Sequence, residues 1–260
     1  GYDTIEWIAA QPWSNGRVGT VGSSYAGITQ VRAALESPPH LAAIWPDVVP
    51  TNSFQHQSRE GGAMQLHMFW ALFIHAQDAQ DIADDWDKQL EVWEDLKHLR
   101  ELFWKFPFEK GELALRHTPT LEQALLDYTT RGAYDDYWAQ ESNDFTAHYD
   151  RHADVPGTFT TGWYDGFPHS DTEYFAAMAE KNATPQRLIV GPWSHVGMRG
   201  DASWTLDVDF GPDSVWGVDR YFTEQLRFFE AYLREDGEPL DDPPVRIFVM
   251  GGGSGRITPE

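Results

Sequence analysis

The sequence predicts an α/β fold in which a mostly parallel sheet, flanked by helices, is interrupted by an inserted helical cap. Three observations lead to this prediction. Short apolar runs alternate with amphipathic helical patterns toward both ends of the chain, as in βαβ units. The middle of the chain keeps helical spacing and has no strand-like runs. The 260 residues are 41% hydrophobic, which is enough for a substantial buried core.

Residues 1–50 are interpreted as the first part of the α/β core. Apolar spacing and helix-ending residues such as Pro12 and Pro38 define its elements. The expected order is a helix over 3–11, a buried strand over 18–21, a helix over 25–37 and a strand over 41–50. A tight corner rich in glycine and serine separates the first strand from the second helix, so a parallel sheet is the natural setting.

Residues 51–150 are interpreted as the helical cap. Apolar side chains recur every three or four positions from Trp86 to Phe106, and Thr118-Pro119 is a typical helix start. The aromatic residues of this segment, such as Phe69, Trp70 and Trp86, either line an acyl or leaving-group pocket or pack the core of the cap itself. We expect the cap to lie over the sheet edge.

Residues 151–240 are interpreted as the rest of the core, because the strand–helix rhythm returns there. The expected elements are a strand over 157–163, a helix over 171–182, a strand over 186–193 and a long amphipathic helix over 218–235. A further apolar run, "VRIFVMGGG", predicts a strand from residue 245 onward.

Composition and charge exclude several classes of function. The formal net charge of −22 argues against nucleic-acid binding, because phosphate recognition needs a basic face. With no cysteine, the chain has no disulfides, thiolate nucleophile or cysteine-bound metal. No apolar run is long enough for a membrane span. The acidity fits either a solvated surface or a site that attracts cationic substrates, and the oligomeric state and compartment stay undetermined.

Three residues with catalytic chemistry follow predicted strands. Ser24 lies in "GSSYAG", Asp165 in "GWYDGF" and His195 in "GPWSH". In an open parallel sheet, ligands bind outside the carboxyl ends of the strands, so these side chains are expected at one edge. Their order along the chain, Ser, Asp, His, is that of α/β-hydrolase triads. The predicted fold is therefore the α/β-hydrolase fold.

The crowded corner fits a serine nucleophile. A serine hydroxyl attacks only when an imidazole takes its proton, and a carboxylate must hold that imidazole in the right tautomer. Small residues around the serine (Gly22, Ala26 and Gly27) relieve the crowding of a sharp strand-to-helix turn. Ser23 is one residue early and is expected to point elsewhere. His195 must be neutral to accept the proton, so activity is expected to fall at acidic pH.

Each motif also has an ordinary explanation. A Gly-x-Ser-x-small stretch often occurs by chance, an aspartate before glycine is common in turns, and His195 is one of 10 histidines. The triad is favoured because all three residues follow predicted strands in the right order.

The three motifs together resemble the CocE/NonD hydrolases, the family of cocaine esterase and X-prolyl dipeptidyl aminopeptidase. "DTIEWIAAQPWSNGRVG" and "YDDYWAQES" resemble it too. The resemblance implies that Ser24 is the nucleophile, Asp165 the orienting acid and His195 the base. It also implies that the backbone N–H of Tyr25 is one oxyanion donor.

The resemblance further implies that the chain is a fragment. Family members carry a tyrosine hydroxyl, the second oxyanion donor, on strands before the position of Gly1. Residues 241–260 then begin a truncated C-terminal jelly-roll domain. Loss of one oxyanion donor costs about 10² to 10³ in turnover. The 260-residue fragment alone is therefore expected to be weakly active or inactive.

The substrate is expected to be a small ester or amide, or a short peptide. Trp163, Phe167 and Trp193 adjoin the triad and are candidate pocket residues. Release of X-Pro dipeptides is the main alternative. It calls for a carboxylate near the pocket that pairs with the free amine of the substrate. The cap supplies acids that are also typical of a solvated surface: Glu60, Asp78, Asp81, Asp84 and Asp85.

Two other classes remain open. A non-catalytic α/β domain would bind a ligand or partner without reaction, although no triad member is missing. Metal-dependent hydrolysis would use His56, His67 or His75, of which His67 and His75 fit one helix face, but no HExxH-like pairing occurs. We expect no cofactor, no metal and no membrane or nucleic-acid partner.

Overall fold

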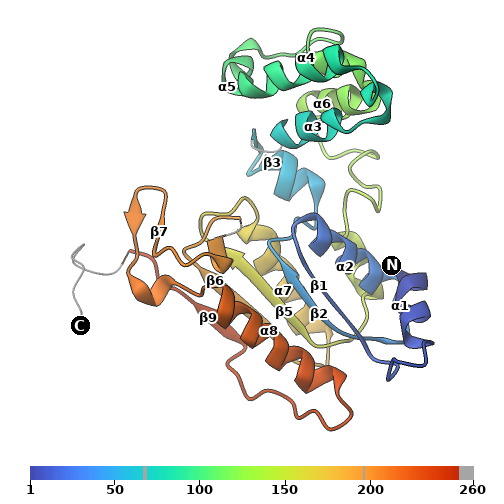
Figure 1. Cartoon of the computed structure of the whole chain (residues 1–260), viewed down its shortest axis with the longest axis vertical. Coiled ribbons are helices and arrows are strands. Elements are labelled where there is room, and N and C mark those ends of the chain that lie inside the picture. The colour runs from blue at the N-terminus through green and yellow to red at the C-terminus, as the bar shows by residue number, and fades with distance from the viewer. Residues whose placement is uncertain (67–68, 196, 252–260) are drawn as a thin grey trace. The chain divides into compact units, whose positions relative to one another are not determined.

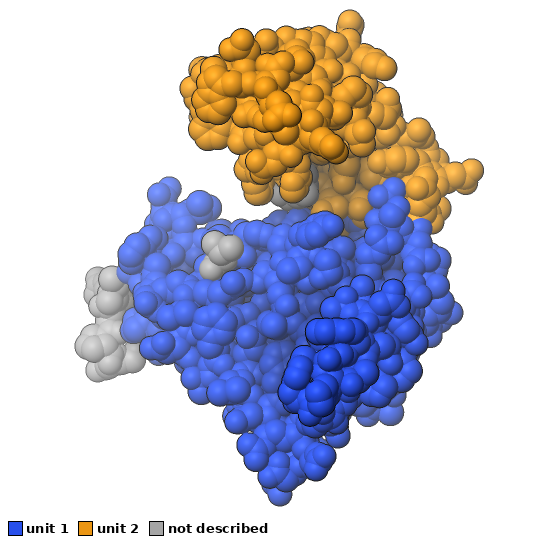
Figure 2. All heavy atoms as spheres, turned by 45° about the vertical axis from the view of Figure 1, so that its right-hand side comes forward, with its two compact units in different colours: residues 1–52, 141–260 blue, residues 53–140 orange. Residues whose placement is uncertain are grey.

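The structure is a computed structural model that describes residues 1–66, 69–195 and 197–251. The chain divides into two compact units, coloured separately in Figure 2. One unit comprises residues 1–52 with 141–260, and the other comprises residues 53–140. The predicted boundaries of the helical segment at 51 and 150, and its role as a cap, stay predictions.

The first unit is built on a five-stranded sheet (Figure 1). The strand order is β1-β2-β5-β6-β9, and every neighbouring pair is parallel. The strands are β1 (Val18–Ser23), β2 (Leu41–Asp47), β5 (Gly157–Gly162), β6 (Gln186–Gly191) and β9 (Val245–Ile247). Ser23 pairs with Asp47 and Asp47 with Thr160, so the carboxyl ends share one edge. This confirms the predicted α/β-hydrolase class of fold.

Helices cover both faces of this sheet. Alternation along β2 shows the two faces, because Ile44 packs into one apolar cluster and Trp45 into another. The first cluster receives side chains from α1 (Tyr2–Ala9), α2 (Tyr25–Leu35) and α7 (Pro168–Lys181). The second receives those of α8 (Val218–Leu233), which crosses the opposite face (Figure 1).

Short elements complete the first unit. They are η5 (Thr146–Arg151), η6 (Gly197–Arg199), β7 (Trp204–Thr205), β8 (Val208–Asp209) and η7 (Pro212–Ser214). β7 and β8 pair as a separate antiparallel hairpin. Within the described residues, no helix is both long and apolar enough to span a bilayer.

The second unit is mainly helical and has its own core. Phe69, Phe73, Val92 and Leu125 are buried there, from helices packed on one another. The helices and turns are η1 (Ser53–Ser58, one π-helical turn), α3 (Phe69–Gln77), η2 (Gln80–Ile82), α4 (Trp86–Lys97), α5 (Leu99–Leu102), η3 (Phe103–Lys105), η4 (Ala114–His117) and α6 (Pro119–Thr130).

The structure corrects the expectation that this segment has no strands. β3 (Arg59–Glu60) and β4 (Ala63–Met64) form a short antiparallel hairpin. Gly61 and Gly62 connect them with positive φ angles of 57° and 86°, as a type I′ turn requires. Strands this short leave no alternating pattern in the sequence, although the Gly-Gly pair is a hairpin signal.

The last strand differs from its expected setting. Val245–Ile247, read as the first strand of a separate β domain, forms β9 and pairs in parallel with β6. Its side chains are exposed or half-buried, as at the edge of a sheet. The assignment of residues 241–260 to a further β domain stays a prediction, and residues 252–260 lie outside the described part of the chain.

Candidate active site

The three predicted catalytic residues follow three strands of the same sheet. Ser24 comes directly after β1, Asp165 shortly after β5 and His195 shortly after β6. Because these strands are parallel, their carboxyl ends lie at one edge of the sheet. The fold thus brings the loops that carry a hydroxyl, a carboxylate and an imidazole to a common edge.

Ser24 occupies an unusual backbone conformation at the start of α2. Its φ is 56° and its ψ is −120°, a region that non-glycine residues rarely adopt. The turn is held from both sides: the Ser24 N–H donates to the Asp47 carbonyl at 2.9 Å, and the Ser24 carbonyl accepts from the Ile28 N–H at 2.9 Å. The serine is therefore fixed on a sharp strand-to-helix turn, half-buried rather than enclosed.

Larger side chains would clash at the positions of the small residues around Ser24. A Cβ on Gly22 would lie 2.7 Å from the Cβ of Ala26, and a Cβ on Gly27 would lie 2.2 Å from Val49 Cγ2. Both distances are shorter than real Cβ contacts allow. The sequence pattern read as a crowded nucleophile turn corresponds to close packing between β1, α2 and the segment after β2.

Asp165 and His195 form a direct pair. His195 Nδ1 lies 2.7 Å from Asp165 Oδ2; the aspartate side chain is 0% exposed and the histidine side chain is 39% exposed. The other aspartate oxygen accepts from the Phe167 N–H at 2.8 Å. Since an ionised carboxylate only accepts hydrogen bonds, a neutral His195 paired with it has its proton on Nδ1 and leaves Nε2 as the acceptor. This is the tautomer that a general base needs.

The serine itself makes no direct bond to this pair. Over residues 1–66, 69–195 and 197–251, no hydrogen bond joins Ser24 Oγ to His195. Catalytic hydrogen bonds are often longer in unliganded proteins and tighten when the substrate binds. The structure therefore pairs the predicted acid and base, and it presents the predicted nucleophile at the same sheet edge.

Tyr25 is the first residue of α2 and its side chain is 76% exposed. The first N–H groups of a helix have no partner within the helix and carry its positive dipole end. Among the described residues, none accepts a hydrogen bond from the Tyr25 N–H. This donor is available to a negatively charged oxygen beside Ser24.

Two of the predicted pocket residues lie next to the acid–base pair. The ring of Phe167 is buried and packs edge-on against His195, with 5.6 Å between the ring centroids. Trp163 is 40% exposed, and its indole N–H donates to the Phe248 carbonyl at 2.8 Å. Phe167 thus supports the imidazole, while Trp163 connects the end of β5 to the segment after β9.

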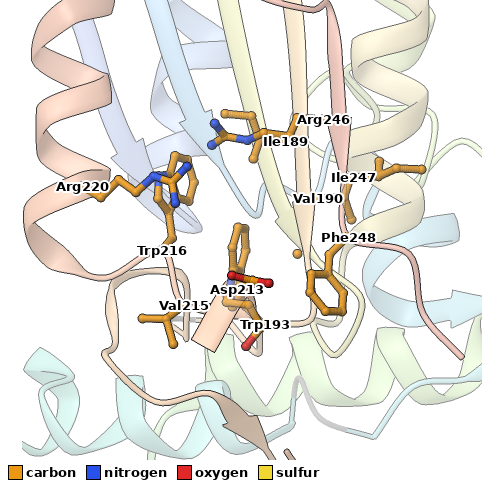
Figure 3. A pocket seen from close by; sticks show the side chains of 12 residues that line it. Ile189, Val190, Trp193, Asp213, Val215, Trp216, Arg220, Arg246, Ile247 and Phe248 are labelled. Carbon is orange, nitrogen blue, oxygen red and sulfur yellow. The ribbon is translucent and has the colours of Figure 1, made fainter. Parts of the chain in front are cut away.

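Trp193 has a packing role. Its indole stacks on Trp216 with 5.3 Å between centroids and donates to the Ser214 carbonyl at 2.8 Å. It also lines a pocket of ≈ 190 Å³ beside β6 and β9, where Figure 3 shows Trp216, Arg220 and Phe248 around it. Its predicted role toward substrate stays a prediction.

Phe69 and Trp70 belong to the helical unit. Phe69 is 1% exposed, and its ring packs against Phe103, Phe106 and Phe108. Trp70 is 46% exposed on the same helix. Phe69 therefore packs the core of its own unit, and contact of either residue with substrate stays a prediction. His67, a candidate metal ligand, lies outside the described residues.

Sequence reasoning missed a buried acid between the nucleophile turn and α8. Asp47, at the end of β2, is fully buried and accepts hydrogen bonds from Ser23 and Tyr221. It lies at the carboxyl end of β2, but the predicted strand continued to residue 50 and enclosed Asp47, so the signal that identified Asp165 was hidden here. Ser23 points away to this acid, in agreement with the expectation that it is not the nucleophile.

A second missed acid is Asp171 in the first turn of α7. It is 1% exposed, and burial raises its pKa well above the usual range, with the nearby charges of Asp165 and Asp47 adding to the rise. Asp171 Oδ1 accepts from the Val49 N–H at 2.9 Å. The preceding Val48 has φ 48°, which is rare for a β-branched residue. This acid therefore holds a strained turn at the same edge.

Comparison with known proteins assigns the family. The model of the X-Pro dipeptidyl-peptidase family S15 matches residues 1–197. The chain belongs to this family. The match includes all three residues of the candidate triad, and the resemblance inferred from the three short motifs is thereby confirmed.

Individual proteins are similar to the chain along nearly all of its length. This S15-family chain is 30% identical to cocaine esterase from Rhodococcus sp. (strain MB1 Bresler) over 259 residues, which cover 96% of the chain and 43% of the esterase. Among solved structures, an aminopeptidase from the marine sediment archaeon Thaumarchaeota archaeon matches with a TM-score of 0.65 at 21% identity, covering 96% of this chain and 40% of that one. A CocE/NonD family hydrolase from Staphylococcus aureus matches with a TM-score of 0.57 at 22% identity, covering 95% and 34%. The S15-family chain thus spans less than half the length of each of these proteins.

Proposed function

We propose that the protein is a serine hydrolase that cleaves ester or amide bonds through an acyl-enzyme intermediate. Ser24 is the nucleophile, His195 the general base and Asp165 the residue that orients it. The observation that carries the proposal is the buried carboxylate of Asp165, 2.7 Å from Nδ1 of the half-exposed His195. Membership of a peptidase family and 30% identity to an esterase support the same reaction class.

The proposed reaction has two stages. Ser24 Oγ attacks the substrate carbonyl while His195 Nε2 takes its proton, and the Tyr25 N–H donates to the oxyanion. The tetrahedral intermediate collapses as His195 returns the proton to the leaving group, which departs as an alcohol or an amine. Water then attacks the acyl-enzyme by the same route, releasing the acid and restoring Ser24.

Covalent labelling tests the nucleophile directly. A fluorophosphonate probe is expected to modify the protein, expressed at its natural full length, on the peptide that contains Ser24, and Ser24→Ala is expected to abolish the labelling. Ser37→Ala is the matched control. Like Ser24, Ser37 has a positive φ angle (46°), but it lies beyond the other end of α2. Labelling that persists in Ser24→Ala, or its absence in the wild type, contradicts the proposal.

Release of X-Pro dipeptides is the second candidate, favoured by the description of the family. It requires a carboxylate for the free amine of the substrate. Among the acids considered for this role, Asp85 already has partners at the start of α4. Its carboxylate accepts from the Lys88 N–H at 3.2 Å and pairs with Lys88 Nζ at 2.8 Å. Hydrolysis of p-nitrophenyl acetate beside Ala-Pro-p-nitroanilide separates the two. Faster cleavage of the anilide, relative to a blocked N-acetyl analogue, supports the peptidase.

A further inference from the structure

A buried polar cluster lies directly beneath the nucleophile turn. Its centre is Asp47, the last residue of β2, whose side chain is fully buried. The backbone carbonyl of Asp47 accepts from the Ser24 N–H at 2.9 Å, and its side chain accepts from the hydroxyl of Ser23 at 3.2 Å. One residue therefore holds both the candidate nucleophile and its neighbour.

The same cluster contacts the segment that follows His195. Arg199, in η6, donates from Nη2 to Ser23 Oγ, which in turn donates to Asp47 Oδ2. The hydroxyl of Ser23 thus bridges a cation from the loop after β6 and an anion from β2. A hydroxyl suits this position because it accepts and donates at the same time.

Helix α8 closes the cluster from the other side. The Tyr221 hydroxyl donates to Asp47 Oδ2 and accepts from Gln225 Nε2 at 3.1 Å. The Arg199 guanidinium lies 5.6 Å from the centroid of the Tyr221 ring, within the range of a cation–π contact. Trp45 donates from its indole N–H to the second oxygen of Asp47 at 2.9 Å. Both oxygens of the buried carboxylate therefore have partners.

The buried negative charge of Asp47 is compensated within the cluster. Burial raises the pKa of Asp47 to about 6, while hydrogen bonds from Tyr221 and Trp45 and the positive charge of Arg199 act in the opposite direction. A carboxyl with this pKa is ionised at neutral pH. Burying an ionised acid is costly unless hydrogen bonds and a countercharge compensate for it, and Arg199 supplies the countercharge.

We propose that Ser23, Asp47, Arg199 and Tyr221 form a positioning cluster that fixes the nucleophile turn relative to the segment carrying His195. This inference rests on the proposed function, because it concerns the geometry in which Ser24 meets His195. None of the four side chains is assigned contact with substrate. Their role is to keep Ser24 and His195 in the alignment required for proton transfer, in which displacements near 1 Å lower rates about 100-fold.

The test compares kcat with KM in single variants of the protein at its natural full length, with p-nitrophenyl acetate as the substrate. Ser23→Ala, Tyr221→Phe and Arg199→Met are each expected to lower kcat about 10- to 100-fold, with KM within about threefold of the wild type. Arg199→Lys keeps the charge and is expected to recover part of the loss. The double variant Ser23→Ala/Arg199→Met is expected to be no slower than the slower single variant. Each single substitution already removes the same Arg199–Ser23 hydrogen bond.

Asp154→Asn is the matched control. Asp154 lies before the amino end of β5, at the opposite edge of the sheet from Ser24. Its carboxylate accepts from the Ala183 N–H and the Thr184 N–H, in the segment between α7 and β6, at 3.0 Å each. This variant is expected to lower the melting temperature and leave kcat unchanged. A kcat within about twofold of the wild type in both Ser23→Ala and Tyr221→Phe, in a protein whose Ser24 is labelled by fluorophosphonate, overturns the positioning cluster alone. A wild type that is not labelled at Ser24 overturns the proposed function and this inference together.

Discussion

At the scale of single residues, the site depends on side chains and backbone held in uncommon states. Ser24 has φ 56°, and conformations of this kind persist only where surrounding contacts enforce them. The glycine and alanine pattern around Ser24 made this turn predictable. Asp47 was not predictable in the same way, because its partners Arg199 and Tyr221 are far away in the sequence and meet it only in the folded chain.

The Asp165–His195 pair gives a prediction at this scale. Asp165→Asn replaces an acceptor by an amide whose NH₂ group can face Nδ1, so the imidazole takes the wrong tautomer. We expect kcat to fall by about 10³ to 10⁴ while the fold is retained, as measured by steady-state ester hydrolysis and circular dichroism. A kcat within tenfold of the wild type would show that Asp165 does not orient the base.

At the scale of elements, apolar runs predicted the sheet better than the helical unit. β5 and β6 are both buried along their whole length. The run Leu188-Ile189-Val190 makes the apolar character of β6 visible in the sequence, whereas β5 (GTFTTG) has one large apolar side chain, Phe159. The helical pattern from residue 86 to 106 is instead divided into α4, α5 and η3. The division falls at His98, whose ψ of 20° leaves the helical region. Apolar spacing continues across such a break, so periodicity alone does not reveal it.

The core of the helical unit supplies a second prediction. Phe69→Ala removes a ring that is 1% exposed and is expected to destabilise this unit by about 3–5 kcal/mol. Trp70→Ala, at an exposed neighbour, is the control and is expected to have little effect on stability. Hydrogen exchange over α4 and α6 measures the difference. Equal protection in Phe69→Ala and the wild type would rule out the core role of Phe69.

At the scale of the whole molecule, three short motifs predicted the family and the class of fold. Each motif spans the carboxyl end of a different strand of one parallel sheet, so residues that are far apart in the sequence lie at the same edge. The edge position of β9 was not predicted. Its short apolar run fits either the sheet or a separate β domain, and only pairing with β6 distinguishes them.

The pH dependence of stability is a property of the whole molecule to which His152 contributes. Burial lowers the pKa of His152 to about 4, with the ring held between the Ala153 carbonyl and the Tyr174 hydroxyl. The ordinary pKa is 6.5, so the unfolded chain binds the proton first as the pH falls. The stability contributed by neutral His152 is therefore present above pH 6.5 and is lost between pH 6.5 and 4.

His152→Asn removes this titration. We expect the difference in unfolding free energy between wild type and variant to shrink by about 3 kcal/mol from pH 7 to pH 4. Urea unfolding of both proteins at each pH measures it. The raised pKa of Asp47 acts in the opposite direction in the same range, but it is common to both proteins and cancels in the difference. A difference that stays constant with pH would show that His152 is not buried in its neutral form.

The most direct measurement is a crystal structure of the protein, at its natural full length, after reaction with a fluorophosphonate. A serine hydrolase built as proposed carries the phosphoryl group on Ser24 Oγ. His195 Nε2 then lies within hydrogen-bond reach of the adduct, about 2.6–3.2 Å, and Nδ1 remains paired with Asp165. An adduct on another residue, or His195 turned away from a phosphorylated Ser24, would contradict the account.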